Sequence, residues 1–87
     1  LKIGEIMSNS LKQDISIGKK LKTMRKAAGL TQDEAAAQMQ IMGLPINADI
    51  LAKIEQGKYS IRISVLAAMK KIYKVDSYDA FFEDIGE

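Results

Sequence analysis

The amino-acid sequence predicts an all-α domain of five short helices and no strand. Apolar residues recur at intervals of three and four along most of the chain, which is the period of one helix face. Residues typical of helix caps, Thr or Asn before a stretch and Gly after it, separate these stretches. A chain of 87 residues that is 47% hydrophobic can build one compact domain and has little room for a second.

The beginning of the chain lacks this period. Residues 1–13 contain several polar breaks and no sustained apolar spacing, so we expect a flexible N-terminal arm or leader there. The domain is expected to occupy residues 14–87.

The first helix is expected to run from Asp14 to Ala28. Gly29 follows it, at the position that the left-handed residue of a C-terminal cap usually occupies. Apolar residues at helical spacing predict the face that packs on the core: Ile17, Leu21, Met24 and Ala28.

A second helix is expected to begin at Gln32. Thr31 and Glu34 form a capping box, in which each side chain binds the backbone of the other residue. Most side chains on the predicted inner face are small, which lets another helix approach closely. Gly43 and Pro45 end the helical pattern. This inner face consists of Ala35, Ala36 and Met39.

A third, short helix is expected over about 48–56. Asn47 can cap its start, and Gly57 marks its end. Its predicted core contacts are Leu51 and Ile54, with Ile46 packing just before the cap.

A fourth helix is expected over 62–73, around Leu66, Met69 and either Ile72 or Tyr73. The last segment begins at Ser77 and holds more apolar surface than a terminal helix needs to dock on one small core. We therefore expect part of it to form a dimer contact, the alternative being that it closes the core of the monomer. Its apolar residues are Tyr78, Phe81, Phe82 and Ile85.

The composition excludes several classes of function. The chain has no cysteine and no histidine, which removes disulfides, thiolate nucleophiles, the usual zinc ligands and the commonest general base. No acid pair has the support that a hydrolase site needs, so we expect no enzyme activity, no metal and no cofactor. No apolar run is long enough to span a membrane and no signal peptide is recognised, so we expect a cytoplasmic protein without a membrane partner.

The net charge of +2 hides an asymmetry along the chain. Residues 1–75 hold all thirteen Lys and Arg with six acids, a net charge of +7, whereas residues 76–87 hold five acids and no base. A cationic body favours a polyanionic partner such as nucleic acid, although a single charged cluster is more often an ordinary solvated face.

Two motifs resemble one known family. The run GLTQ at 29–32 and the run IEQGK at 54–58, in this order, resemble the Cro/CI (XRE-type) helix-turn-helix family, over about residues 15–82. The stretch 53–62 resembles a subgroup with a lengthened turn between the second and third helices, here Gln40 to Pro45. The resemblance implies a five-helix lambda-repressor-like DNA-binding domain whose third helix enters the major groove.

The resemblance also implies a set of DNA-contacting residues. Gln32 matches a family glutamine that holds a DNA phosphate, where the helix N-terminus favours anions. The other matches lie at the recognition positions of the third helix and along the segment that follows it. They are Asn47, Ala48, Asp49 and Lys53, and then Lys58, Tyr59 and Arg62. The alternative for the charged residues in this set is a solubilising surface role.

Arg25 and Glu55 match a family ion pair between the first helix and the end of the third. The planar guanidinium suits a partly buried carboxylate in a two-point contact, the alternative being two unrelated surface charges. Asp49 departs from the family pattern. It could accept from a cytosine amino group as a base reader, or it could only stabilise the helix N-terminus.

The function expected from these features is that of a bacterial transcriptional regulator, most simply a repressor, that binds double-stranded DNA as a homodimer. The alternative is an antitoxin-type module, in which the acidic aromatic tail from Asp76 to Glu87 contacts a basic partner protein and DNA binding is autoregulatory or absent. No small-molecule effector site is evident from the sequence.

Overall fold

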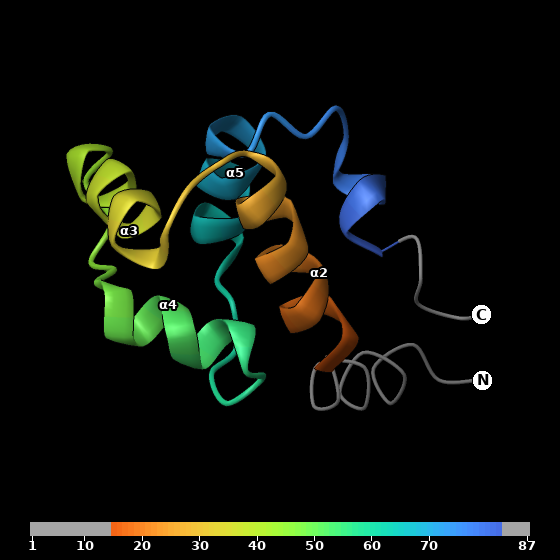
Figure 1. Cartoon of the computed structure of the whole chain (residues 1–87), viewed down its shortest axis with the longest axis horizontal. Helices are drawn as coiled ribbons and strands as arrows, with labels where there is room; N and C mark the ends of the chain where they lie inside the picture. The colour runs from red at the N-terminus through yellow and green to blue at the C-terminus, as the bar shows by residue number, and fades with distance from the viewer. Residues whose placement is uncertain (1–14, 83–87) are drawn as a thin grey trace.

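The computed structural model describes residues 15–82 and is all-α over that range (Figure 1). The prediction of an all-α fold is confirmed for these residues. Within the described part of the fifth predicted helix, residues 78–82 form a short 3-10 helix. The elements are α2 (Ile15–Ala27), α3 (Gln32–Ile41), α4 (Ala48–Glu55), α5 (Ile63–Ile72) and η1 (Tyr78–Phe82).

Helix α4 packs against both α2 and α3, α3 also packs against α5, and η1 packs against α2 (Figure 1). Each element contributes apolar side chains to a single core, so the predicted inner faces meet. The largest fully buried side chains are Leu21, Met39, Leu51, Met69 and Phe81.

The helix starts follow the predicted caps. The Thr31 side chain accepts from the Glu34 backbone N–H at 3.1 Å, and Glu34 Oε1 accepts from the Thr31 backbone N–H at 2.9 Å. Asn47 Oδ1 accepts from the Ile50 backbone N–H at 2.8 Å and thereby caps α4. These bonds satisfy donors that a helix start otherwise leaves without partners.

The end of α2 is closed by the predicted glycine. Gly29 has φ +78°, a left-handed conformation that other residues rarely adopt. Its N–H donates to the Lys26 carbonyl at 2.9 Å, and the Leu30 N–H donates to the Arg25 carbonyl at 3.2 Å. This paired closure turns the chain from α2 toward α3.

A close approach of α2 to α4 depends on Gly18. A Cβ atom at this position would lie 2.6 Å from the Glu55 carbonyl oxygen and 3.0 Å from that of Ile54. Both neighbours are backbone atoms at the end of α4, which cannot rotate away. The absence of a side chain at Gly18 therefore sets how near the two helices lie.

Some details differ from the sequence prediction. Ala28 lies beyond the end of α2 and is exposed, because the chain already turns at that point. At the end of α5 the buried residue is Tyr73, whereas Ile72 is only partly buried. The predicted arm over residues 1–13 lies outside the described residues.

The Tyr73 hydroxyl is buried and has no hydrogen-bond partner among the described residues. Burial raises the pKa of Tyr73 well above its ordinary value, and the nearby Glu55 carboxylate raises that pKa further. The fold therefore favours the neutral hydroxyl but does not use it as a donor.

We expect Tyr73→Phe to be neutral or stabilising by up to about 1 kcal/mol near pH 7, because it removes an unsatisfied buried group.

The raised pKa of Tyr73 also predicts that the free energy of unfolding depends on pH. Below pH about 10 both folded and unfolded chains hold the phenolic proton, and above it only the unfolded chain releases it. Urea unfolding should therefore show the parent losing stability relative to Tyr73→Phe as pH rises past about 10. Equal pH slopes for both proteins would contradict this, and Tyr78→Phe at a half-exposed ring is the control.

Helix α5 ends without a glycine. Lys74 has φ +58°, and the Val75 N–H donates to the Lys70 carbonyl at 2.9 Å in the same type of closure as at α2. A residue with a Cβ is strained in this conformation by about 1–2 kcal/mol.

We expect Lys74→Gly to raise the free energy of unfolding by about 1 kcal/mol, and the thermal midpoint by about 4–8 °C. Lys74→Ala keeps the Cβ and is the matched control. An Ala variant that gains as much as the Gly variant in a calorimetric melt would show that the lysine charge, not the backbone, is responsible.

Candidate nucleic-acid interface

Helices α3 and α4 pack on each other and are joined by residues 42–47. The Gln40 side chain donates to the Ile46 carbonyl at 2.7 Å across this turn, and Ile46 is buried. Gln40 belongs to α3, so the turn begins later than the sequence predicts. The turn is thus fixed at both ends by contacts to the core and to α3.

The side of α4 that faces away from the core carries the predicted recognition residues. Leu51 and Ile54 are buried on the inner side, while Asn47 and Asp49 are exposed and Ala48 is partly exposed. The Asn47 carbonyl oxygen is used by the cap, and its amide N–H groups have no partner among the described residues. The first turn of α4 can therefore donate hydrogen bonds outward.

Asp49 and Lys53 form an ion pair one turn apart on α4. Asp49 Oδ2 lies 3.1 Å from Lys53 Nζ, and the Asp49 side chain remains 73% exposed. The hydrogen bond to Asp49 raises the pKa of Lys53, and Lys53 Nζ also lies 5.5 Å from the centre of the Tyr59 ring. Besides the two roles predicted from the sequence, Asp49 thus has a third one, which is to hold Lys53 in place.

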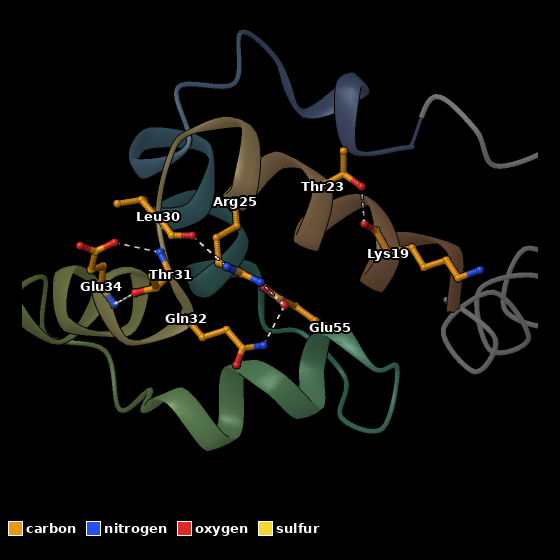
Figure 2. A network of polar contacts seen from close by, with 8 residues as sticks. All are labelled: Lys19, Thr23, Arg25, Leu30, Thr31, Gln32, Glu34 and Glu55. Atoms are coloured by element: carbon orange, nitrogen blue, oxygen red, sulfur yellow. Dashed lines mark hydrogen bonds and ion pairs between the residues drawn. The ribbon is translucent and has the colours of Figure 1, made fainter.

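A buried polar network joins three helices (Figure 2). Arg25 on α2 donates through Nε to Glu55 Oε2 at 2.7 Å and through Nη2 to Glu55 Oε1 at 3.1 Å. Its Nη1 donates to the Leu30 carbonyl at 2.8 Å in the loop that leads to α3. The bonds to Glu55 raise the pKa of Arg25 in spite of its burial.

Gln32, at the start of α3, joins the same carboxylate. Its Nε2 donates to Glu55 Oε1 at 3.1 Å, and its side chain is only partly buried (Figure 2). A carboxamide nitrogen carries two hydrogens, so one donor remains for another ligand. Glu55 therefore fixes α2, α3 and α4 relative to one another.

The comparison with protein families agrees with this arrangement. Residues 16–80 match the helix-turn-helix domain family, from the first turn of α2 into η1. The chain belongs to the helix-turn-helix domain family. No curated protein and no solved structure gives a significant match. None of the helices within residues 15–82 has the length and apolar character needed to cross a membrane.

The helix-turn-helix is made by α3, residues 42–47 and α4. The residues predicted to follow the DNA backbone lie directly after α4, where Lys58, Tyr59 and Arg62 are exposed. Two of them, Lys58 and Arg62, have no side-chain hydrogen bond or ion pair within the described residues. A basic segment thus continues from the end of the second helix of the motif.

The C-terminal aromatic residues do not share one surface. Phe81 is 1% exposed and packs in the core, so the prediction that it contributes to a dimer contact is wrong for this structure. Its side chain is covered because η1 packs against α2. Tyr78 and Phe82 are 45% and 43% exposed and remain available, and Ile85 lies outside the described residues.

Two features of the domain were missed in the sequence prediction. The Asp49–Lys53 pair has the i,i+4 spacing at which opposite charges meet on a helix, a signal that could have found it. The role of Gly18 carries no local signal, because it depends on where α4 lies.

Proposed function

We propose that this helix-turn-helix protein is a sequence-specific transcriptional regulator, acting as a repressor, that inserts the first turn of α4 into the major groove of operator DNA. Helix-turn-helix domains bind DNA with the second helix of the motif. The observation that carries the proposal is the start of α4, where Asn47 and Asp49 are exposed and the Asn47 amide N–H groups have no partner within the described residues.

Within the helix-turn-helix domains we place the chain with the Cro/CI (XRE-type) proteins, in a five-helix lambda-repressor-like fold with a lengthened turn. The GLTQ motif at 29–32 begins α3, and the IEQGK motif at 54–58 closes α4. The Arg25–Glu55 contact supports this placement, because it joins α2, which the first motif follows, to α4, which the second motif closes.

Phosphate contacts position such a protein on the duplex. The proposed donors are the second Nε2 hydrogen of Gln32 and the cations Lys58 and Arg62, which have no partner among the described residues, with Tyr59 beside them. Asp33 and Glu34 lie in the same turn of α3 as Gln32 and weaken its attraction for an anion, so the segment after α4 should supply most of the phosphate affinity.

Asp49→Asn tests which residues read bases. Loss of the negative charge should strengthen binding to unrelated DNA, because one repulsion from the phosphates disappears. If Asp49 reads a cytosine amino group, the preferred base at one position should change, with about 1–3 kcal/mol of discrimination lost. Anisotropy titrations on the selected site and on single-base variants of it measure both effects. An unchanged base preference would eliminate the reader role and leave the pairing with Lys53.

Lys53→Ala is the companion variant, since it removes the other half of the pair. It should weaken binding to all sequences and reduce the salt slope by about one if Lys53 meets a phosphate. Lys71→Ala, at an exposed position on α5 outside the helix-turn-helix, is the matched control. A slope equal to that of Lys71→Ala would remove Lys53 from the phosphate contacts.

We further propose that the protein binds its operator as a homodimer, with Tyr78 and Phe82 in the contact between copies. Their half-exposed rings support this contact. Two half-sites about 34–36 Å apart would follow from paired recognition helices. Sedimentation showing one monomer per operator would count against it.

The experiment that tests the function as a whole is selection of bound sequences from a random DNA pool with the purified protein. We expect one enriched motif with two-fold symmetry, because a dimer reads two equivalent half-sites. Absence of enrichment, together with no measurable DNA affinity at low salt, would overturn the proposal.

A second candidate function is that of an antitoxin-type module. The half-exposed aromatic rings of Tyr78 and Phe82 lie in an acidic stretch with Asp76 and Asp79, and this chemistry suits a basic partner protein. Co-purification of one defined basic protein with the tagged chain from its native source would favour it. Symmetric operator selection without such a partner would favour the regulator.

A further inference from the structure

A groove of about 420 Å³ opens between α4 and the first turn of α5. Its volume lies in the range of small-molecule sites, about 300–1,000 Å³. Ile46, Ile54 and Val65 are almost fully buried and line the groove, and Ile50 lines it while remaining partly exposed. These four side chains give the groove an aliphatic floor that is already formed.

The rim of the groove is basic. Lys58 and Arg62 line it. Among the described residues no acidic side chain lines it, and neither cation has a side-chain partner there. Ser60 and Ser64 add two hydroxyls. An aliphatic floor with two unpaired cations at its edge complements a small molecule that has one apolar end and one anionic end.

We propose that this groove binds a small carboxylate with an aliphatic chain, which packs its hydrocarbon on Ile50 and Ile54 and places its carboxylate between Lys58 and Arg62. A phosphate of the DNA backbone would satisfy the cations but leave the aliphatic floor empty. A neutral apolar ligand would cover the floor but leave the cations without a partner. The carboxylate with an aliphatic body satisfies both.

The groove shares residues with the DNA-binding surface. Lys58 and Arg62 are the proposed phosphate donors, and Ile50 belongs to α4 within its first turn. Bound carboxylate and bound DNA would therefore compete, and each would lower the affinity for the other by the same factor. This regulatory consequence rests on the proposed function, whereas binding of the carboxylate does not.

The test uses the full ¹⁵N-labelled chain and octanoate as the probe, followed by amide chemical shifts. We expect saturable shifts at millimolar concentration, concentrated on the backbone of residues 46–65. The matched probes 1-octanol and octylamine carry the same chain with a neutral or cationic end. They should bind at least about fivefold more weakly, because they lack the anion that pairs with the cations.

Two variants locate the carboxylate. Lys58→Gln and Arg62→Gln should each raise the Kd for octanoate by about three- to tenfold, the size expected for one partly exposed ion pair. Both positions are exposed, so the fold should remain intact. Lys71→Gln, an exposed lysine outside the groove, should leave the Kd unchanged.

Three results would overturn the proposal: no saturable shift with octanoate, equal binding of 1-octanol, or shifts centred on exposed apolar residues away from the groove, such as Ile41 and Phe82. Competition is measured separately, with octanoate against acetate at equal ionic strength in the DNA titration. If the chain has no affinity for DNA, the regulator proposal fails while the octanoate result stands on its own.

Discussion

Arg25→Ala is expected to lower the free energy of unfolding by about 3–5 kcal/mol, because it leaves the Glu55 carboxylate buried without its charged partner. The Arg25 and Glu55 side chains are 5% and 2% exposed, so the pair lies out of bulk water. The Leu30 carbonyl also loses its donor, and among the described residues only Gln32 still donates to Glu55. Since the free energy of unfolding of a small domain is about 5–15 kcal/mol, the Arg25→Ala variant should retain only a small part of it.

Thermal and urea unfolding of three further variants tests whether the loss of the charged partner of Glu55 causes this destabilisation. Arg25→Lys keeps the charge but not the two-point fork, and should fall between the parent and Arg25→Ala. The double variant Arg25→Met with Glu55→Leu should be more stable than Arg25→Ala, because no buried charge remains. Lys26→Ala, at the exposed neighbouring position, should lie within about 0.5 kcal/mol of the parent. A melt of Arg25→Ala that matches Lys26→Ala would refute the role of the pair.

Gly18→Ala should destabilise the fold by about 2 kcal/mol, although alanine is the better helix former by about 1 kcal/mol. The added methyl would lie 2.6 Å from the Glu55 carbonyl oxygen, so α2 and α4 must move apart. The thermal midpoint should drop by about 8–16 °C.

The same displacement would stretch the Arg25–Glu55 bonds, which lie between the same two helices. Gly18→Val should therefore be worse than Gly18→Ala, while Lys22→Ala at an exposed position on α2 is the control. Any gain in the midpoint of Gly18→Ala would mean that helix propensity outweighs the contact, and would disprove the close approach.

Features that depend on local chemistry could be predicted from the sequence. The capping box at Thr31, the Asn47 cap and the left-handed Gly29 each involve atoms within a few residues, so the pattern alone specifies them. The inner faces of the helices follow for the same reason, since the apolar period is fixed by helix geometry.

Features that depend on how the elements pack could not be predicted. The sequence treats Phe81 and Phe82 alike, and only the position of η1 against α2 buries one and exposes the other. The groove beside Ile50 likewise exists only once α4 and α5 lie side by side, and no spacing in the sequence indicates it. The unsatisfied Tyr73 hydroxyl has no sequence signal either, because its surroundings come from other helices.

The convergence of Arg25, Gln32 and Leu30 on and around Glu55 bears on the thermodynamics of recognition. Helices held at a fixed mutual angle before a ligand arrives need no backbone ordering when it binds, so the entropic cost of docking comes from the surface side chains and from the lost translational and rotational freedom of the two partners. Without folding coupled to association, the heat-capacity change on complex formation reflects only the surface that the two partners cover. One buried carboxylate thus holds α2, α3 and α4 in one arrangement before any partner binds.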